Sequence, residues 1–408
     1  MTQFSEKTII SIVGLTNVGK STLFNVITGQ KNKAIVDSKA GTTADNVISL
    51  MELHGLGKIK LIDTAGIDEN GILGDKKREK TKQAIDESDL ILFVIKNNTE
   101  ILNQYENDIL QYIKEKNKQF LIIINQFNEK INTLNINNTK SLQINLNQQN
   151  QQLIITDFIL NNYKNNNKPI DLLPNLQLKN SYVLLIIPLD EESPELRLLR
   201  PQSLVIERLL QKFAIPVLYR PDLKNFDKNN FIETINNLKN MQNGLSLIIT
   251  DSQAINKIYD FVPKDISFTS FSIIMSNYMS NGKLNNFING AKQLDNLNDG
   301  DNILIVEACN HDRNCNDIAT VQLPNAIKKY TNKNINFDFN FGQSFPTKEE
   351  IQNKNYKLII ACGGCMIDRQ KYQARLNLIQ ELNIPMSNYG IVFSYVKNKK
   401  ILDKINIF

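Results

Sequence analysis

Short apolar runs alternate with longer amphipathic stretches along the whole chain. In the first 165 residues, apolar runs stand at Ile9–Val13, Val47–Leu53, Lys58–Ile62, Leu90–Ile95 and Phe120–Ile124. Helical periodicity follows near 22–27, 76–87 and 101–116. Short continuous apolar runs are typical of strands buried on both faces. Their alternation with helices predicts an α/β fold with a doubly wound, mostly parallel sheet.

The alternation resumes after a polar linker at 161–168, which suggests further domains. Strands are predicted at Tyr182–Ile187, Pro216–Tyr219 and Leu245–Ile249, and later at Ile303–Glu307 and Tyr356–Ile360. We therefore expect three α/β domains, over 1–165, 174–262 and 265–408. The three strands of the second domain would leave an apolar sheet edge, which either pairs with a second copy or packs inside a compact domain.

The stretch between the first strand and the first helix reads Gly14-Leu-Thr-Asn-Val-Gly-Lys-Ser-Thr22. In a strand–loop–helix context this string predicts a phosphate-binding loop rather than an ordinary glycine turn. Its backbone N–H groups and the helix N-terminus would cradle phosphate oxygens, Lys20 would reach the β- and γ-phosphates, and Ser21 would bind Mg²⁺. The expected nucleotide contacts of this loop are Asn17, Val18, Gly19, Lys20, Ser21 and Thr22.

The third predicted strand ends in Asp63-Thr64-Ala65-Gly66. An acid at the end of a buried strand beside a phosphate loop can hold Mg²⁺ through water. The N–H of Gly66 can then bond the γ-phosphate. The alternative is that Asp63, and Thr43 further upstream, are only strand-end and turn residues.

These pieces, in this order, resemble the translation-factor-type GTPases, most closely the Era and TrmE group. Asn17 in the phosphate loop and the string Gly41-Thr42-Thr43 resemble its potassium-activated members. The resemblance implies that Thr43 joins Ser21 and Asp63 on Mg²⁺, and that Asn17 and the first switch coordinate K⁺. It also implies catalytic roles for Lys20, Thr43, Asp63 and Gly66. Ile67 stands where Ras-like enzymes have a water-orienting glutamine, so we expect slow hydrolysis that depends on K⁺ or on a conformational event.

The base-reading motif of that group, N-K-x-D, is Asn125-Gln126-Phe127-Asn128 in this chain. An aspartate accepts hydrogen bonds from both guanine N1–H and the exocyclic amine, whereas Asn128 offers one acceptor and one donor. The loss costs roughly 1.5–3 kcal/mol. We expect Asn125, Gln126 and Asn128 to face the base, and to hold either GTP weakly or a related base. The serine–alanine loop that usually completes the site is not recognisable within 143–150.

All four cysteines lie in the last quarter of the chain. Cys309 follows one predicted strand, and Cys362 and Cys365 follow another with C-x-x-C spacing, so soft ligands gather at one sheet edge. Gly363 and Gly364 leave backbone N–H groups free to bond cluster sulfides. From the residues alone, a zinc site, an iron–sulfur cluster, a redox dithiol and inert buried thiols all remain open.

This ending resembles the HydF family of FeFe-hydrogenase maturation GTPases. The resemblance is carried by Cys309-x-His311, by Cys362-x-x-Cys365, and by the strings at 250–254, 269–272, 306–309 and 388–390. It implies a GTPase domain, a dimerisation domain and a C-terminal domain that binds a 4Fe–4S cluster through Cys309, Cys362 and Cys365. It further implies a homodimeric scaffold that receives a di-iron precursor from the maturation enzymes HydE and HydG and delivers it to apo FeFe-hydrogenase.

Two positions depart from that family. Ala361 stands where the family has a histidine before C-x-x-C, and Cys315 is an additional thiol. The fourth iron ligand is therefore open between His311, Cys315 and water.

The composition limits which classes of partner and which cellular locations we expect. The net charge of +5 is spread along the chain without a basic block, so we expect no nucleic-acid partner. We expect no membrane contact, since no apolar run is long enough to span a bilayer. A polar N-terminus without a signal or an arginine-rich transit segment predicts the cytoplasm, with a hydrogenosome-type organelle as the alternative. Two other functions stay open: an Era/TrmE-like GTPase acting on RNA, and a regulatory GTPase with a structural zinc.

Overall fold

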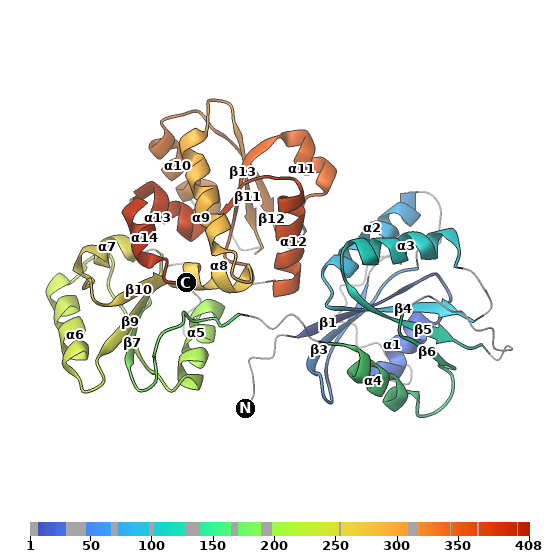
Figure 1. Cartoon of the computed structure of the whole chain (residues 1–408). Helices are drawn as coiled ribbons and strands as arrows, with labels where there is room; N and C mark the ends of the chain where they lie inside the picture. The colour runs from blue at the N-terminus through green and yellow to red at the C-terminus, as the bar shows by residue number, and fades with distance from the viewer. Residues whose placement is uncertain are drawn as a thin grey trace. The chain divides into compact units, whose positions relative to one another are not determined.

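The computed structural model describes residues 7–29, 46–66, 72–97, 102–127, 139–164, 170–188, 198–252, 254–308, 317–342, 344–364, 367–397 and 399–408. The chain divides into two compact units, Met1–Lys168 and Pro169–Phe408. The two units are coloured blue to green and green to red in Figure 1.

The first unit is built on a six-stranded sheet in the order β2-β3-β1-β4-β5-β6. β2 is antiparallel to β3, and all other neighbours are parallel, which confirms the predicted mostly parallel sheet. Its strands are β1 (Thr8–Gly14), β2 (Val47–Leu53), β3 (Gly57–Asp63), β4 (Leu90–Lys96), β5 (Gln119–Asn125) and β6 (Ser141–Ile144).

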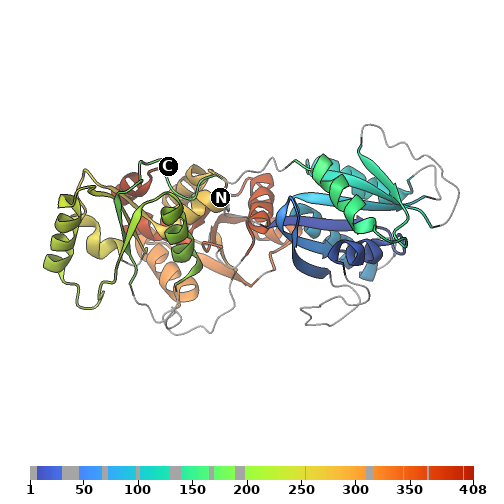
Figure 2. The ribbon, with the colours of Figure 1, turned by 90° about the horizontal axis from the view of Figure 1, so that it is seen from below.

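Helices cover both faces of this sheet, as Figures 1 and 2 show. One apolar layer joins the sheet to α1 (Lys20–Thr28) and α4 (Gln151–Asn162). The opposite layer joins it to α2 (Ile72–Asp86) and α3 (Gln104–Glu115). The central strand β4 is buried on both sides because its alternate side chains enter the two layers. The carboxyl ends of β1, β3, β4 and β5 therefore meet at one edge, where an α/β fold places its ligand.

The second unit contains two four-stranded, wholly parallel sheets. The first has the order β10-β9-β7-β8, with β7 (Tyr182–Ile186), β8 (Ile215–Tyr219), β9 (Leu245–Thr250) and β10 (Ser267–Ser270). The second has the order β12-β11-β13-β14, with β11 (Asn302–Glu307), β12 (Asn336–Phe341), β13 (Tyr356–Ala361) and β14 (Met386–Asn388).

Ten α-helices among the described residues complete this unit. They are α5 (Arg200–Gln211), α6 (Lys228–Asn240), α7 (Ile255–Ile258), α8 (Phe271–Met279), α9 (Leu284–Lys292), α10 (Leu323–Thr331), α11 (Lys348–Lys354), α12 (Arg369–Glu381), α13 (Tyr389–Lys397) and α14 (Lys399–Ile405). Helical turns lie at Tyr259–Phe261, Gln293–Asn296 and Ile318–Gln322.

The boundary between the two sheets differs from the sequence-based expectation. β10 forms the edge of the first of these sheets, although its residues lie in the segment expected to begin the third domain at 265. The expected three-stranded sheet therefore has four strands. One apolar cluster runs through both sheets, which explains why they form a single compact unit.

Sequence strings that are far apart meet at the seam between the two sheets. The hydroxyl oxygens of Ser252 and Ser272 lie 2.7 Å apart, and Thr269 donates a 2.8 Å hydrogen bond to the carbonyl of Ile405. Asn388, at the end of β14, donates to Ser276 on α8. The strings at 250–254, 269–272 and 388–390 thus contribute to packing of the seam. None of the helices that the structure describes has the length and apolar character needed to cross a membrane.

Candidate functional site

The phosphate loop lies between β1 and α1. Asn17 is exposed and adopts a left-handed backbone conformation with φ 60°, which asparagine tolerates better than most residues. Lys20 is buried, and its Nζ donates a 2.6 Å hydrogen bond to the carbonyl of Leu15, back across the loop. Ser21 and Thr22 stand in the first turn of α1. The structure thus brings the predicted phosphate-binding residues into one loop.

Asp63 lies beside this loop and is buried. Ser21 Oγ donates a 2.7 Å hydrogen bond to Asp63 Oδ2, while Oδ1 has no hydrogen-bond partner in the described part of the chain. Burial raises the pKa of Asp63, against the lowering effects of the Ser21 hydrogen bond and the Lys20 charge. A buried carboxylate with an unused oxygen beside a serine hydroxyl supplies the hard oxygen donors that Mg²⁺ prefers. The residues present therefore fit Mg²⁺.

Gly66 holds the end of the β3 segment close against the phosphate loop. A Cβ atom at Gly66 would lie 2.0 Å from Thr16 Oγ1 and 2.8 Å from the Thr16 nitrogen. Only glycine fits this approach. Thr43, the expected switch threonine, lies outside the described residues.

Asn125 connects the phosphate loop to the turn that follows β6. Its Nδ2 donates a 3.1 Å hydrogen bond to the carbonyl of Val18, and its Oδ1 accepts one of 3.3 Å from the N–H of Leu146. The turn at Leu146, within the 143–150 segment where no serine–alanine loop is recognisable, is thus hydrogen-bonded to the first residue of the predicted base-reading motif. Its contact uses a backbone N–H, which leaves no side-chain signature.

Gln126 and Phe127 continue from β5 at the same edge. The N–H of Gln126 donates to the carbonyl of Ile144 at 2.9 Å. Lys96 is paired with Asn125 in the sheet register, and its Nζ lies 5.5 Å from the centroid of the Phe127 ring. Sequence reasoning missed Lys96, because only the register brings it to this motif. Asn128 lies outside the described residues.

The second candidate site lies at the carboxyl ends of β11 and β13. The N–H of Ala308 donates a 3.3 Å hydrogen bond to Cys362 Sγ, and the N–H of Cys362 donates to the carbonyl of Val306 at 2.9 Å. Ala308 directly precedes Cys309 in the sequence. A sulfur that accepts a backbone hydrogen bond is suited to the thiolate form that binds metals.

The other predicted ligands, Cys309, His311, Cys315 and Cys365, lie outside the described residues. Within the described residues, no group of three histidine, cysteine, aspartate or glutamate side chains is close enough to hold a metal ion. Of the predicted cluster ligands, the structure therefore describes Cys362 alone, at the end of β13 and beside the end of β11.

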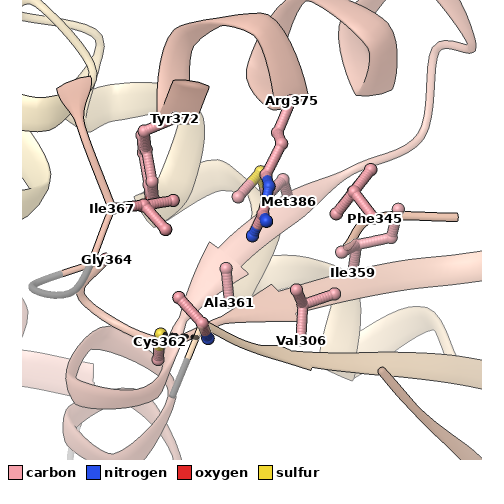
Figure 3. Close-up of a pocket in the computed structure, with 11 residues that line it drawn as sticks. Val306, Phe345, Ile359, Ala361, Cys362, Gly364, Ile367, Tyr372, Arg375 and Met386 are labelled. Carbon is pink, nitrogen blue, oxygen red and sulfur yellow. Dashed lines mark hydrogen bonds between the residues drawn. The ribbon is translucent and has the colours of Figure 1, made fainter. Parts of the chain in front are cut away.

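A small pocket opens beside Cys362, as Figure 3 shows. Tyr372 and Arg375 of α12 line it together with apolar side chains from β11, β13 and β14. Tyr372 is buried, and its burial and the nearby Cys362 raise its pKa well above the ordinary value.

The edge strand β8 exposes apolar side chains. Leu218 is 55% exposed, and Phe213, just before the strand, is 70% exposed. β8 pairs only with β7 among the described strands. Pro216, which lacks an N–H, suits such an edge position.

Family comparisons agree with this architecture. A model described as 50S ribosome-binding GTPase matches residues 9–126. Models described as hydrogen maturase F dimerization domain and hydrogen maturase F tetramerization domain match residues 172–280 and 285–406. The fold and the phosphate site define a P-loop GTPase with further α/β domains. Because the two maturase models together match more than half of the chain, it belongs to the hydrogen maturase F (HydF) family.

Two similar individual proteins, both named as GTPases, match part of this chain. GTPase Der of Bartonella tribocorum is 42% identical over 126 residues, which are 30% of this chain and 26% of that protein. The tRNA modification GTPase MnmE of Mycoplasmoides gallisepticum is 38% identical over 159 residues, 37% of this chain and 32% of that protein. The chain thus spans about a quarter to a third of the length of these curated relatives.

Solved structures with similarity to this chain include two GTPases. The G domain of the FeoB iron transporter of T. maritima has a TM-score of 0.31 and 18% identity, covering 39% of this chain and 99% of that one. Aquifex aeolicus Era has a TM-score of 0.32 and 24% identity, covering 53% of this chain and 93% of that one.

Proposed function

We propose that this chain is a GTP-hydrolysing scaffold that carries a 4Fe–4S cluster and delivers the di-iron precursor of the hydrogenase active site to apo FeFe-hydrogenase. The observation that carries the proposal is the position of Cys362 Sγ, 3.3 Å from the nitrogen of Ala308, the residue that precedes Cys309 in the sequence. The chain belongs to the HydF family, and we propose that Cys309 joins Cys362 at this edge of the sheet.

In the nucleotide site, Lys20 neutralises phosphate charge, Ser21, Thr43 and Asp63 hold Mg²⁺, and the N–H of Gly66 bonds the γ-phosphate. Asn17 helps to bind K⁺, which supplies transition-state charge in place of an arginine. Hydrolysis is slow and stimulated by K⁺, because Ile67 cannot orient water. Support comes from the Ser21–Asp63 hydrogen bond and from the unused Asp63 oxygen.

In the cluster site, Cys309, Cys362 and Cys365 supply three thiolates. His311 or Cys315 is the candidate fourth ligand. A bound cluster would supply iron with one exchangeable position. The Ala308 N–H stabilises the Cys362 thiolate by hydrogen bonding. HydE and HydG are the proposed donors of the cargo, in the cytoplasm, and hydrolysis changes partner binding rather than the chemistry of the cluster.

In this proposal, residues 1–165 bind and hydrolyse GTP. Residues 174–262, extended by β10, form the dimerisation domain, and the remaining C-terminal part binds the cluster. We propose that two copies pair through the apolar edge at β8. Leu218→Lys should then reduce the dimer fraction measured by light scattering, because the added charge must be desolvated. Leu153→Lys is the matched control, since Leu153 is 71% exposed on α4 in the other unit.

Anaerobic reconstitution with iron and sulfide, followed by metal counting and EPR of the reduced protein, tests the main proposal. About four irons and four sulfides per chain are expected. Cys309→Ser, Cys362→Ser and Cys365→Ser should each abolish assembly and keep nucleotide binding, whereas Lys20→Ala should lose hydrolysis and keep the cluster. Zinc without iron or sulfide would instead support a regulatory GTPase with a structural metal. Tight, salt-sensitive binding of tRNA or rRNA would favour the RNA-acting alternative.

A further inference from the structure

Cys365 and Met366 are flanked in the sequence by two residues that hydrogen-bond to each other. The N–H of Ile367 donates a 3.2 Å hydrogen bond to the carbonyl of Gly364. Gly364 has φ 68°, a left-handed conformation that glycine adopts without steric cost. The chain therefore enters and leaves the short segment that supplies Cys365 at two positions that are fixed relative to each other.

The Gly364 end of this segment is held by packing. A Cβ atom at Gly364 would lie 2.8 Å from Tyr372 Cδ2 and 3.4 Å from Met279 Cε. Tyr372 lies on α12 and Met279 ends α8, and both side chains are buried. Figure 3 shows Gly364, Ile367 and Tyr372 on the same side of the pocket. Since buried side chains are close-packed, they leave Gly364 little room to move.

The Ile367 end is held by a residue of the neighbouring sheet's helices. Arg200 Nη1 donates a 3.3 Å hydrogen bond to the carbonyl of Ile367, across 167 positions of sequence. Arg200 is the first residue of α5, which packs against α8. A guanidinium keeps its charge at every working pH, and a hydrogen bond from a charged donor is stronger than one between neutral groups. Arg200 thus fixes the carbonyl that lies two residues after Cys365.

We propose that Arg200 is a positioning residue for Cys365, because it fixes one end of the segment that supplies this thiol. The inference rests on the proposed function, in which Cys365 is a cluster ligand. A metal ligand has to be held within roughly 0.5 Å of its productive geometry. A segment that is already ordered loses less conformational entropy when its ligand binds. Loss of Arg200 therefore loosens the segment in the metal-free chain and makes an assembled cluster more labile.

Hydrogen exchange in the metal-free, full-length chain tests the local effect. Arg200→Met removes the guanidinium and should speed exchange in peptides covering 363–368, read by mass spectrometry, about threefold to tenfold. The urea midpoint of the chain should stay close to that of the wild type, since Arg200 is exposed. Arg200→Lys keeps the charge without the planar guanidinium and should give an intermediate rate.

Arg208→Met is the matched control. Arg208 lies on the same helix, and its Nη2 lies 2.8 Å from Asp171 Oδ2, so the substitution removes an ion pair elsewhere on α5. Exchange in the 363–368 peptides should match that of the wild type. Equal exchange in the wild type and in Arg200→Met, or the same acceleration in Arg208→Met, overturns the proposal.

Reconstituted protein provides a second readout. Iron release to a chelator under anaerobic conditions should be about threefold to tenfold faster in Arg200→Met than in the wild type, whereas Arg208→Met should match the wild type. Iron release at the wild-type rate in Arg200→Met would contradict the positioning role, even if exchange is faster. A wild-type chain that assembles no cluster would refute the proposed function instead. The exchange rates would then still decide whether Arg200 fixes the segment.

Discussion

Ser21 Oγ and Asp63 Oδ2 are joined by a 2.7 Å hydrogen bond across 42 positions of sequence. This bond fixes the start of α1 against the end of β3. The second carboxylate oxygen, Oδ1, is buried without a hydrogen-bond partner in the described structure. Nucleotide-free protein therefore holds a carboxylate whose charge is poorly compensated, and a divalent cation would relieve that cost.

Asp63→Asn should stabilise the nucleotide-free protein at neutral pH and abolish its response to Mg²⁺. The folded pKa of Asp63 is raised, so the ionised form is favoured less in the folded than in the unfolded state. The contribution of Asp63 to stability therefore falls as pH rises from its unfolded pKa through its folded pKa. An asparagine carries no charge at this position and so avoids that loss. The gain should be about 1 kcal/mol, or about 2–4 °C in melting temperature.

Thermal unfolding with and without Mg²⁺ and GTP measures both effects. In the wild type, Mg²⁺ with nucleotide should raise the melting temperature by linkage. The idea fails if Mg²⁺ still adds the same stabilisation to Asp63→Asn.

Asn125→Ala should weaken nucleotide binding about tenfold or more and destabilise the first unit by about 1–3 kcal/mol. The substitution leaves the Val18 carbonyl and the Leu146 N–H without their side-chain partner. Asn97→Ala is the control. Asn97 is also buried, at the end of β4, yet neither of its side-chain polar atoms has a hydrogen-bond partner among the described residues. Equal losses in the two variants, measured by calorimetric titration and thermal unfolding, would contradict this assignment.

GTP should bind more weakly than to a protein with N-K-x-D, and Asn128→Asp should tighten it by about tenfold or more. The Asn128 side chain can accept from a purine N1–H and donate to a carbonyl at C2, a pairing that xanthine offers and guanine does not. We therefore expect the affinity for XTP relative to GTP to be higher in the wild type than in a protein with N-K-x-D. The same relative affinity should fall in Asn128→Asp. Sub-micromolar GTP binding by the wild type in a competition titration would exclude this explanation.

Asp295 should stabilise the second unit only above acidic pH. Its carboxylate accepts hydrogen bonds from Tyr330 at 2.5 Å, Tyr395 at 2.7 Å and Lys399 at 2.8 Å. Burial raises the pKa of Asp295, but these bonds outweigh it and hold the pKa at about 2. A depressed pKa gives stability that is present above the unfolded value of about 3.9 and is lost as pH falls toward 2.

Asp295→Asn should therefore cost about 1 kcal/mol at pH 7, with allowance for solvent screening, and almost nothing at pH 2. Urea unfolding followed by circular dichroism is suitable, because the chain contains no tryptophan. Glu233→Gln, an exposed change on α6, is the control and should keep the wild-type urea midpoint at pH 7. If Asp295→Asn loses the same free energy of unfolding at every pH, the charge of Asp295 does not account for the effect.

Gly290→Ala should destabilise the second unit, although alanine is the better helix former by up to about 1 kcal/mol. A Cβ atom at Gly290 would lie 1.9 Å from the carbonyl oxygen of Met386, which is backbone and cannot rotate away. The clash should outweigh the propensity, with a net loss of about 2 kcal/mol. Asn289→Ala, exposed on the same helix, should stay within about 0.5 kcal/mol of wild type. Urea midpoints compare the two, and a more stable Gly290→Ala would show that α9 moves away from β14.

The sequence by itself determined the features that depend on neighbours along the chain. The phosphate loop is a run of consecutive residues, and strand–helix alternation follows from the local period of apolar positions, so both were predictable. The placement of Asp63 beside Ser21 was also predictable, since parallel strands in such a fold end at one edge.

Only the tertiary structure decided the features that depend on non-local pairing. β10 belongs to the sheet of β9 because it pairs with that strand. The sequence of β10 alone does not specify which strand it pairs with. Leu146 reached Asn125 through a backbone N–H that every residue but proline carries. Arg375 lines one pocket with Cys362 because α12 packs against β11 and β13, and no spacing in the sequence encodes where a helix will pack.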